Sequence, residues 1–233
     1  MAATGLADER TAEPETIAAI PPPEGYERVA AAQGSFGECL RTIALKEDRH
    51  VYLYNGELKR NQSAQFAVLD IPVGKKDLQQ CADAVMRLRA EYLFSRKKYS
   101  EIAFRDNNNK WYKWTGGDNR AGFEKYLENV FGWCGTASLE KQLRAVTGLQ
   151  QMQPGDVFIR GGFPGHAMIV VDMAMNKEGE KVFMLAQSYM PAQDIHVVNN
   201  DGDSRLSPWY QMQEGEEIDT PEWVFAPSQL RTW

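Results

Sequence analysis

The sequence is poor in cysteine and histidine, which limits the chemistry that it can support. Only three residues of each kind occur in 233. Three scattered cysteines are too few for a disulfide framework, and no CxxC pair suggests zinc. The histidines also lack the close spacing of a His-rich metal motif. We therefore expect no metal, no other cofactor and at least one free thiol. The residues are Cys39, Cys81, Cys134, His50, His166 and His196.

A surplus of basic residues and a long apolar run are also lacking. The formal net charge is -6, whereas binding to nucleic-acid phosphates needs an excess of Lys and Arg on one face. No run of about 18 apolar residues occurs, so no segment is expected to span a membrane. From these absences we expect no nucleic-acid partner and no integral membrane segment. They say nothing about the oligomeric state.

The first residues carry few large apolar side chains, and the prolines at positions 21–23 favour an extended backbone. We expect a disordered arm or tether over residues 1–24 and a single domain over residues 25–233. No signal peptide is visible, which fits either a cytoplasmic protein or an exported one whose leader is absent. The polar opening, rich in Ala, Glu and Pro, resembles a tether that follows such leaders. We therefore expect the periplasm or cell envelope.

The folded part alternates between helix and strand signals, which predicts an α+β protein. Asn55-Gly56 is a strong hairpin turn within residues 50–62. A helix is predicted to begin after Asp77, with one buried face that includes Cys81 and Tyr92. Further helices are expected over about 121–131 and 138–146, and strands over 65–71, 157–159, 166–171, 181–189, 195–198 and 223–225.

One constellation could carry chemistry. Cys81 lies in the first turn of its predicted helix, where the helix dipole would lower the thiol pKa. His166 begins a predicted strand and could accept the thiol proton and later return it to a leaving group. Gln187, on the next strand, could hold the imidazole. The predicted catalytic residues are therefore Cys81, His166 and Gln187. Substitutes for the orienting role are Ser188, Gln193 and Asp194.

The order of these elements resembles that of papain-like hydrolases. Residues 149–158, followed by 165–171, resemble the core of NlpC-type cysteine peptidases. Residues 77–83 with 87–92 resemble a bacterial envelope family that is known only as a domain of unknown function, and this likeness covers most of residues 25–233. The resemblance implies a papain-like core, in which an N-terminal helix packs on a mostly antiparallel sheet, with an added N-terminal hairpin and a helical insertion. It also implies a peptide or peptidoglycan-type substrate.

Two alternatives remain open at this point. Cys134 precedes another predicted helix and is nearer to His166 in sequence, so it is a rival nucleophile; Cys39 has no polar neighbours that suggest chemistry. The chain could also be a catalytically silent module of the same fold that binds a cell-envelope peptide or glycan through the aromatic residues between Trp111 and Trp114. The leading hypothesis is a thiol hydrolase of the cysteine peptidase or amidase kind.

Overall fold

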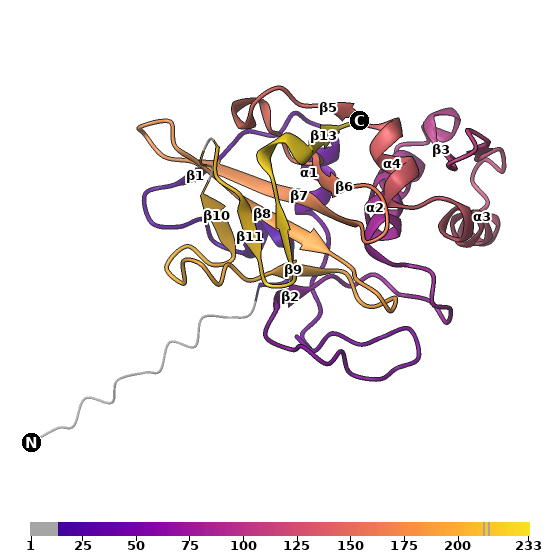
Figure 1. Cartoon of the computed structure of the whole chain (residues 1–233), viewed down its shortest axis with the longest axis horizontal. Helices are drawn as coiled ribbons and strands as arrows, with labels where there is room; N and C mark the ends of the chain where they lie inside the picture. The colour runs from indigo at the N-terminus through magenta and orange to yellow at the C-terminus, as the bar shows by residue number, and fades with distance from the viewer. Residues whose placement is uncertain (1–13, 212, 214) are drawn as a thin grey trace, which may run out of the picture.

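The computed structural model describes residues 14–211, 213 and 215–233, and these residues form one large sheet with few helices (Figure 1). The sheet has nine strands, in the order β2-β9-β8-β7-β6-β13-β5, with β1 attached to β7 and β10 to β8. All its strand pairs are antiparallel. The strands are β1 (Glu27–Arg28), β2 (Gln65–Val68), β5 (Arg144–Ala145), β6 (Val157–Arg160), β7 (His166–Met175), β8 (Lys181–Gln187), β9 (His196–Val198), β10 (Trp209–Gln211) and β13 (Leu230–Thr232).

Strand β7 organises this sheet because it is ten residues long and almost wholly buried. Its length allows two short strands to share one edge: β6 pairs with residues 166–169 and β1 with residues 174 and 175. Strand β8 is shared in the same way by β9 and β10. Two small hairpins lie outside the sheet, formed by β3 (Ala103–Arg105) with β4 (Trp111–Lys113) and by β11 (Ile218–Thr220) with β12 (Trp223–Phe225).

The prediction of a papain-like, NlpC-type core is wrong. The described residues build a mostly antiparallel nine-stranded sheet, and segments from the whole length of the chain contribute to it. Strand β1 comes from near the N-terminus, and β13, close to the C-terminus, lies between β6 and β5. The resemblance depended on two short stretches around β6 and β7. Such local patterns predict strands, but they do not determine which distant segments pair with them.

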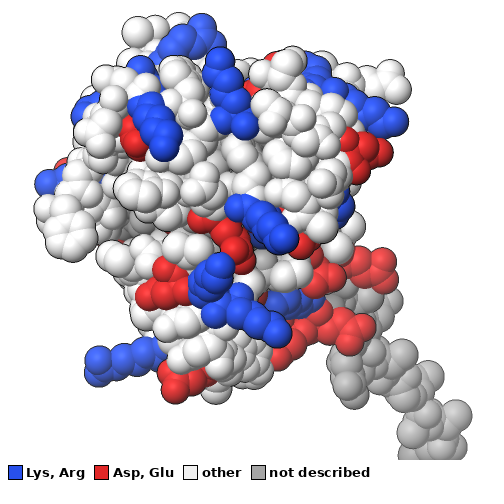
Figure 2. All heavy atoms as spheres, turned by 90° about the vertical axis from the view of Figure 1, so that its right-hand side faces the viewer, with Lys and Arg blue, Asp and Glu red and all other residues white. Residues whose placement is uncertain are grey.

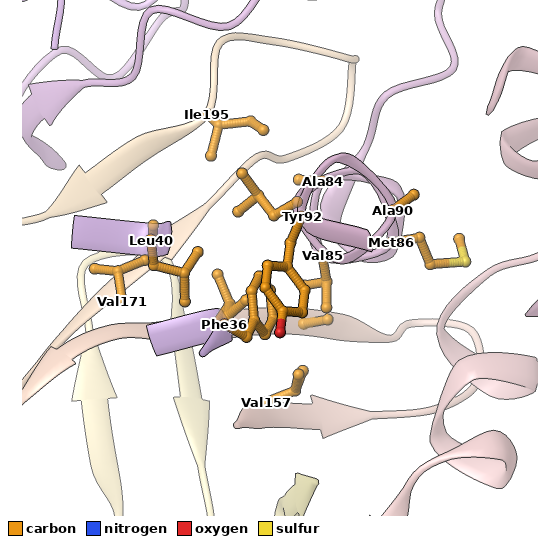
Figure 3. Packing of buried hydrophobic residues seen from close by; sticks show 14 of the residues in the cluster. Phe36, Leu40, Ala84, Val85, Met86, Ala90, Tyr92, Val157, Val171 and Ile195 are labelled. Atoms are coloured by element: carbon orange, nitrogen blue, oxygen red, sulfur yellow. The ribbon is translucent and has the colours of Figure 1, made fainter. Parts of the chain in front are cut away.

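Helix α2 is the central helix of the molecule. Residues 82–86 are all buried, so the helix has no solvent-facing side at this level. It packs against β7 and α1 on one side and against α3 and α4 on the other. In Figure 3, Val85 and Tyr92 point toward Phe36 of α1, whereas Met86 points to the opposite side of α2. The helices are α1 (Phe36–Arg41), α2 (Cys81–Ser95), α3 (Arg120–Trp133) and α4 (Thr136–Gln142), with short 3-10 helices at Ile17–Ala19, Tyr99–Glu101, Leu149–Gln151 and Pro227–Gln229.

The start of α2 differs slightly from the sequence prediction. Gln80, not Asp77, is the N-cap, so Cys81 is the first helical residue. The Gln80 backbone N–H donates to Asp83 Oδ2 at 3.0 Å, which ties the first turn together. Asp77 instead accepts hydrogen bonds from the Gln80 side chain and from the Ala192 N–H. These contacts fix the turn that carries the candidate nucleophile.

Residues 1–13 of the predicted arm lie outside the described residues. The rest of that segment is packed: Ile17 and Ile20 are fully buried, and Thr16 forms an isolated bridge with Ala44. Packed structure therefore begins before residue 25. The predicted hairpin at residues 50–62 is present as a turn with a single bridge between Tyr52 and Leu58, and it forms no regular strands.

On the face that Figure 2 presents, basic and acidic residues are interspersed over most of the surface, and several acidic residues gather at its lower right. None of the helices in the described part of the chain is both long and apolar enough to traverse a lipid bilayer. The expected lack of an integral membrane segment is consistent with this finding.

Candidate functional site

A cavity of about 300 Å³ lies beside the first turn of α2 and the beginning of β7. Cys81, His166 and Cys134 all line it, together with Tyr189 and Trp223. The loop of residues 162–165 forms another wall. The structure thus brings two of the three predicted site residues, and the rival thiol, to one concave surface.

The loop before His166 requires a glycine at its last position. A Cβ atom on Gly165 would lie 2.5 Å from the carbonyl oxygen of Gly162 and equally close to Thr136 Oγ1. Real Cβ atoms are not accommodated at such distances, so only glycine permits this close approach of loop and helix α4. The loop carries Phe163 at its tip, almost fully exposed at the rim of the cavity.

Cys81 is half-buried and therefore reachable from the cavity. Burial raises its pKa to about 11, and the nearby Asp83 acts in the same direction. The backbone N–H groups of Cys81, Ala82 and Ala167 act in the opposite direction, because they can donate to the sulfur. The expected lowering of the thiol pKa by the helix start is thus wrong: desolvation outweighs these donors. Since Ala167 follows His166, its contact places the sulfur near the start of β7.

His166 is buried to 1% exposure and is held by hydrogen bonding and ring packing. Its Nε2 atom lies 2.7 Å from Oε1 of Gln187. The ring centroids of Tyr189 and Trp223 lie 4.8 and 5.3 Å from that of the imidazole. Burial lowers the pKa of His166 to about 4, the hydrogen bond to Gln187 opposes this shift, and the charge of Lys59 adds to it. The imidazole is therefore neutral at pH 7.

Behind His166, a buried polar network surrounds the amide of Gln187. The Gln187 nitrogen donates to Oε2 of Glu222 at 2.8 Å and lies 3.2 Å from Nε2 of His196. Lys59 forms an ion pair with the same carboxylate oxygen of Glu222 at 2.6 Å. Both Lys59 and Gln187 are almost fully buried. All three polar groups of the amide, its oxygen and two N–H bonds, therefore have a partner.

This network determines which nitrogen of His166 carries the proton. An ionised carboxylate such as Glu222 can only accept, so the amide nitrogen of Gln187 must face it. The amide oxygen then faces His166 and can only accept from it. Nε2 of His166 must therefore be the protonated nitrogen, and Nδ1 keeps its lone pair.

The neighbouring histidine fits the same scheme. His196 Nδ1 lies 2.9 Å from the backbone oxygen of Asp194, so this nitrogen donates. Its Nε2 atom is then an acceptor for the second N–H of Gln187. Burial lowers the pKa of His196 to about 3, and the Lys59 charge contributes in the same direction. Both histidines are thus neutral around Gln187.

Cys134 follows α3 and lies next to Gly135, the N-cap of α4, so it is outside the first turn of any helix. It is 7% exposed, and burial raises its pKa to about 12. No hydrogen bond joins His166 to the sulfur of Cys81 or Cys134 in the described part of the structure. Cys39, in α1, is half-buried and does not line this cavity.

Two of the three predicted substitutes for Gln187 are engaged elsewhere, and the side-chain nitrogen of the third, Gln193, is buried without a hydrogen-bond partner among the described residues. Ser188 donates to backbone oxygens of Gln79 and Gln193. Asp194 forms an ion pair with Lys46 and accepts from a backbone N–H. The amide oxygen in contact with His166 is therefore that of Gln187.

Four residues of this region escaped the sequence analysis: Lys59, Asp83, His196 and Glu222. His196 could have been found, because an antiparallel β8–β9 pair places it directly opposite Gln187. Asp83 lies two residues after Cys81 on a helix whose burial on all sides was not predicted. Lys59 lies in an irregular segment and Glu222 in a turn, far apart in sequence, and no local pattern connects them.

Among residues 14–211, 213 and 215–233, no group of three or more His, Cys, Asp or Glu side chains is arranged to hold a metal ion.

Comparison with known proteins gives a family but no function. A family model described as a domain of unknown function (4846) matches the chain over residues 17–121 and 103–232. No curated protein and no solved structure gives a significant match. The matched segments cover nearly the whole sequence, which confirms the expectation of a family of unknown function. The chain therefore belongs to the domain-of-unknown-function family 4846.

Proposed function

We propose that this protein is a thiol hydrolase that cleaves an amide bond through an acyl-enzyme. The observation that carries the proposal is the cavity that both Cys81, at the start of α2, and His166, whose ring is held by Gln187, line. A reachable thiol, an imidazole with a free nitrogen and a group that orients the imidazole are the parts that such catalysis needs.

In this reaction, the sulfur of Cys81 attacks the carbonyl carbon while its proton moves to Nδ1 of His166. The imidazolium then gives that proton to the leaving nitrogen, and the C–N bond breaks. Water hydrolyses the resulting thioester, with His166 as base again, and restores the thiol. The backbone N–H of Cys81 can stabilise part of the charge on the carbonyl oxygen.

The pKa values define the resting state of this proposed site. With a thiol pKa of about 11 and an imidazole pKa of about 4, both groups are neutral at pH 7. His166 would therefore act as a general base during the attack, in contrast to sites that hold a preformed thiolate and imidazolium.

The proposed substrate is a peptide of the cell-wall type or a related amide, and the proposed location is the periplasm or cell envelope. Both rest on the sequence resemblance alone. The cavity supports a small acyl group, since it is about 300 Å³ in volume.

The test needs a reactive acyl donor rather than the natural substrate. The full chain is incubated with p-nitrophenyl acetate, and the peptides that carry each cysteine are analysed by mass spectrometry. We expect an acetyl group on Cys81. Replacing His166 with Gln should slow acetylation by about 10²-fold or more, the usual contribution of a general base.

Two control variants identify the nucleophile. Cys81→Ser should abolish the thioester, whereas Cys134→Ala should leave acetylation of Cys81 within about twofold of wild type, because Ala fits the volume of a buried Cys. Acetylation of Cys134 instead would assign the role to the rival thiol. Absence both of a thioester and of p-nitrophenol release from the folded wild type would refute the hydrolase.

A catalytically silent binding module is the second candidate, and one observation favours it: the raised pKa of Cys81 leaves the thiol unreactive at rest. The aromatic residues that were expected to bind a glycan give the binding module less support than this pKa does. Trp111 is 48% exposed, but Tyr112 and Trp114 are buried in the core. In this alternative, the cavity binds an envelope peptide or glycan without cleaving it.

A further inference from the structure

The cavity contains a carboxylate that the reaction above does not use. Asp83 lines the cavity, is 6% exposed and lies in the same helical turn as Cys81. Its Oδ2 atom accepts from the Gln80 N–H, but its buried Oδ1 atom has no hydrogen-bond partner among the described residues. A buried oxygen without a donor is costly, so a ligand that supplies one would be favoured.

The charges of the cavity wall all have one sign. Asp77 and Asp83 are its acidic lining residues, and no Lys or Arg of the described chain lines it. Asp77 is exposed, and its Oδ1 atom accepts from the side chain of Gln80 and from the backbone N–H of Ala192. Asp83 is the buried one of the two, with an oxygen that has no partner among the described residues, and a cation would complement it.

Another lining residue supplies a donor. Trp223 lines the same cavity, and its buried indole N–H also has no partner in the described structure. An unpaired acceptor at Asp83 and an unpaired donor at Trp223 suit a ligand that carries an N–H group together with a carbonyl. Amino-acid amides and peptides with a free amine have both.

We propose that Asp83 binds the ammonium group of an amine-bearing amide substrate and thereby holds that substrate next to Cys81. This assignment rests on the proposed function, because the reaction is the hydrolysis described above. It adds the class of substrate: an acyl compound with a free primary amine near the bond that is cleaved. Burial raises the pKa of Asp83 well above its usual range, because the ionised carboxylate is poorly solvated there, and the N–H of Gln80 opposes this shift. A bound ammonium would stabilise the ionised form.

The experiment compares two reagents that share one reacting group. Methyl methanethiosulfonate is neutral, and 2-aminoethyl methanethiosulfonate carries an ammonium group. The rate of modification of Cys81 is followed by mass spectrometry of its peptide in the full-length protein. In wild type, we expect the ratio of cationic to neutral rates to exceed that of N-acetylcysteine amide by about fivefold or more.

The variant Asp83→Asn removes the charge and retains an oxygen that can cap the Gln80 N–H. Its rate ratio should fall to that of the free thiol. Asp70→Asn is the matched control, because Asp70 is exposed and does not line the cavity; its ratio should equal that of wild type. The wild-type comparison with the free thiol remains decisive if Asp83→Asn does not fold.

The outcomes separate the two proposals. If Cys81 reacts with the neutral reagent but shows no cationic preference, the Asp83 site is refuted and the hydrolase stands. A preference that persists unchanged in Asp83→Asn also refutes it. If Cys81 reacts with neither reagent and forms no thioester with p-nitrophenyl acetate, the hydrolase and the substrate class that depends on it both fail.

Discussion

The two sides of His166 differ in how completely their polar atoms are paired. On the inner side, every polar atom of the Gln187 amide has a partner, and Glu222 and Lys59 close the network as an ion pair. On the cavity side, Asp83 and Trp223 each have a buried polar atom without one in the described structure. The inner side therefore fixes a geometry, and the cavity side is suited to receive a ligand.

The comparison also separates stability from function. A fully paired buried network contributes to a unique arrangement, because the loss of one member leaves others unsatisfied. An unpaired atom costs stability in the free protein and is useful only if a ligand pairs with it. Substitutions on the inner side should therefore reduce folding stability as well as activity, whereas those on the cavity side should mainly change binding.

The largest effect is expected from Glu222→Leu. This change leaves the ammonium of Lys59, which is 6% exposed, without its partner, and it removes the acceptor that orients Gln187. Breaking a buried pair from one side costs about 3–5 kcal/mol. We expect this loss in the free energy of unfolding by urea titration, together with slower acetylation of Cys81.

A double variant distinguishes the ion pair from simple packing. Lys59→Met with Glu222→Leu removes both charges, so it should recover at least half of the stability lost in Glu222→Leu. Acetylation should stay slow, since Gln187 still lacks the carboxylate. If the double variant loses as much stability as Glu222→Leu alone, the charges of the pair contribute nothing beyond the volume of the two side chains.

A smaller effect concerns pH. The folded-state pKa of His196 is about 3, below its ordinary value of 6.5, so the unfolded chain binds a proton that the fold does not. Stability is therefore fully present above pH 6.5 and decreases as pH falls toward 3. At pH 5, His196 should account for roughly 2 kcal/mol of this loss.

His196→Gln removes this titration and leaves that of His166. The unfolding free energy of the variant should depend less steeply on pH between 6.5 and 4, by about one proton, than that of wild type. Buried carboxylates with raised pKa values change stability with pH in the opposite direction. Both proteins contain them, so their contribution cancels when the two slopes are compared. Parallel pH profiles would show that His196 is solvated in the native state.

Local patterns in the sequence predict a substantial part of this site. The β-branched run after His166 predicts β7, and the position of Gln187 on the following strand predicts its contact with the imidazole. These predictions work because β7 and β8 are neighbours in sequence and pair with each other. The helix that begins at Cys81 is likewise determined by residues close to it.

The rest depends on contacts between distant segments. Nothing near β13 indicates that it inserts beside β6, more than sixty residues away in sequence, and this insertion is part of why the predicted papain-like core is wrong. The predicted lowering of the Cys81 thiol pKa is wrong for a related reason. The helix start favours a thiolate, but the packing of α2 on all sides, which the sequence pattern does not reveal, determines the solvation of Cys81.

The smallest effect is expected at Trp111, on the side of the molecule that the binding alternative would use. Its ring is 48% exposed and lies 5.9 Å from the guanidinium of Arg105. Trp111→Ala should therefore cost at most about 1 kcal/mol of unfolding free energy and leave the acetylation rate of Cys81 unchanged.

A pull-down with peptidoglycan fragments tests the binding alternative. If Trp111→Ala abolishes binding of the fragments while Asp83→Asn does not, the ligand lies on the β3–β4 hairpin rather than in the cavity. Loss of binding in Asp83→Asn alone would assign it to the unpaired side of His166.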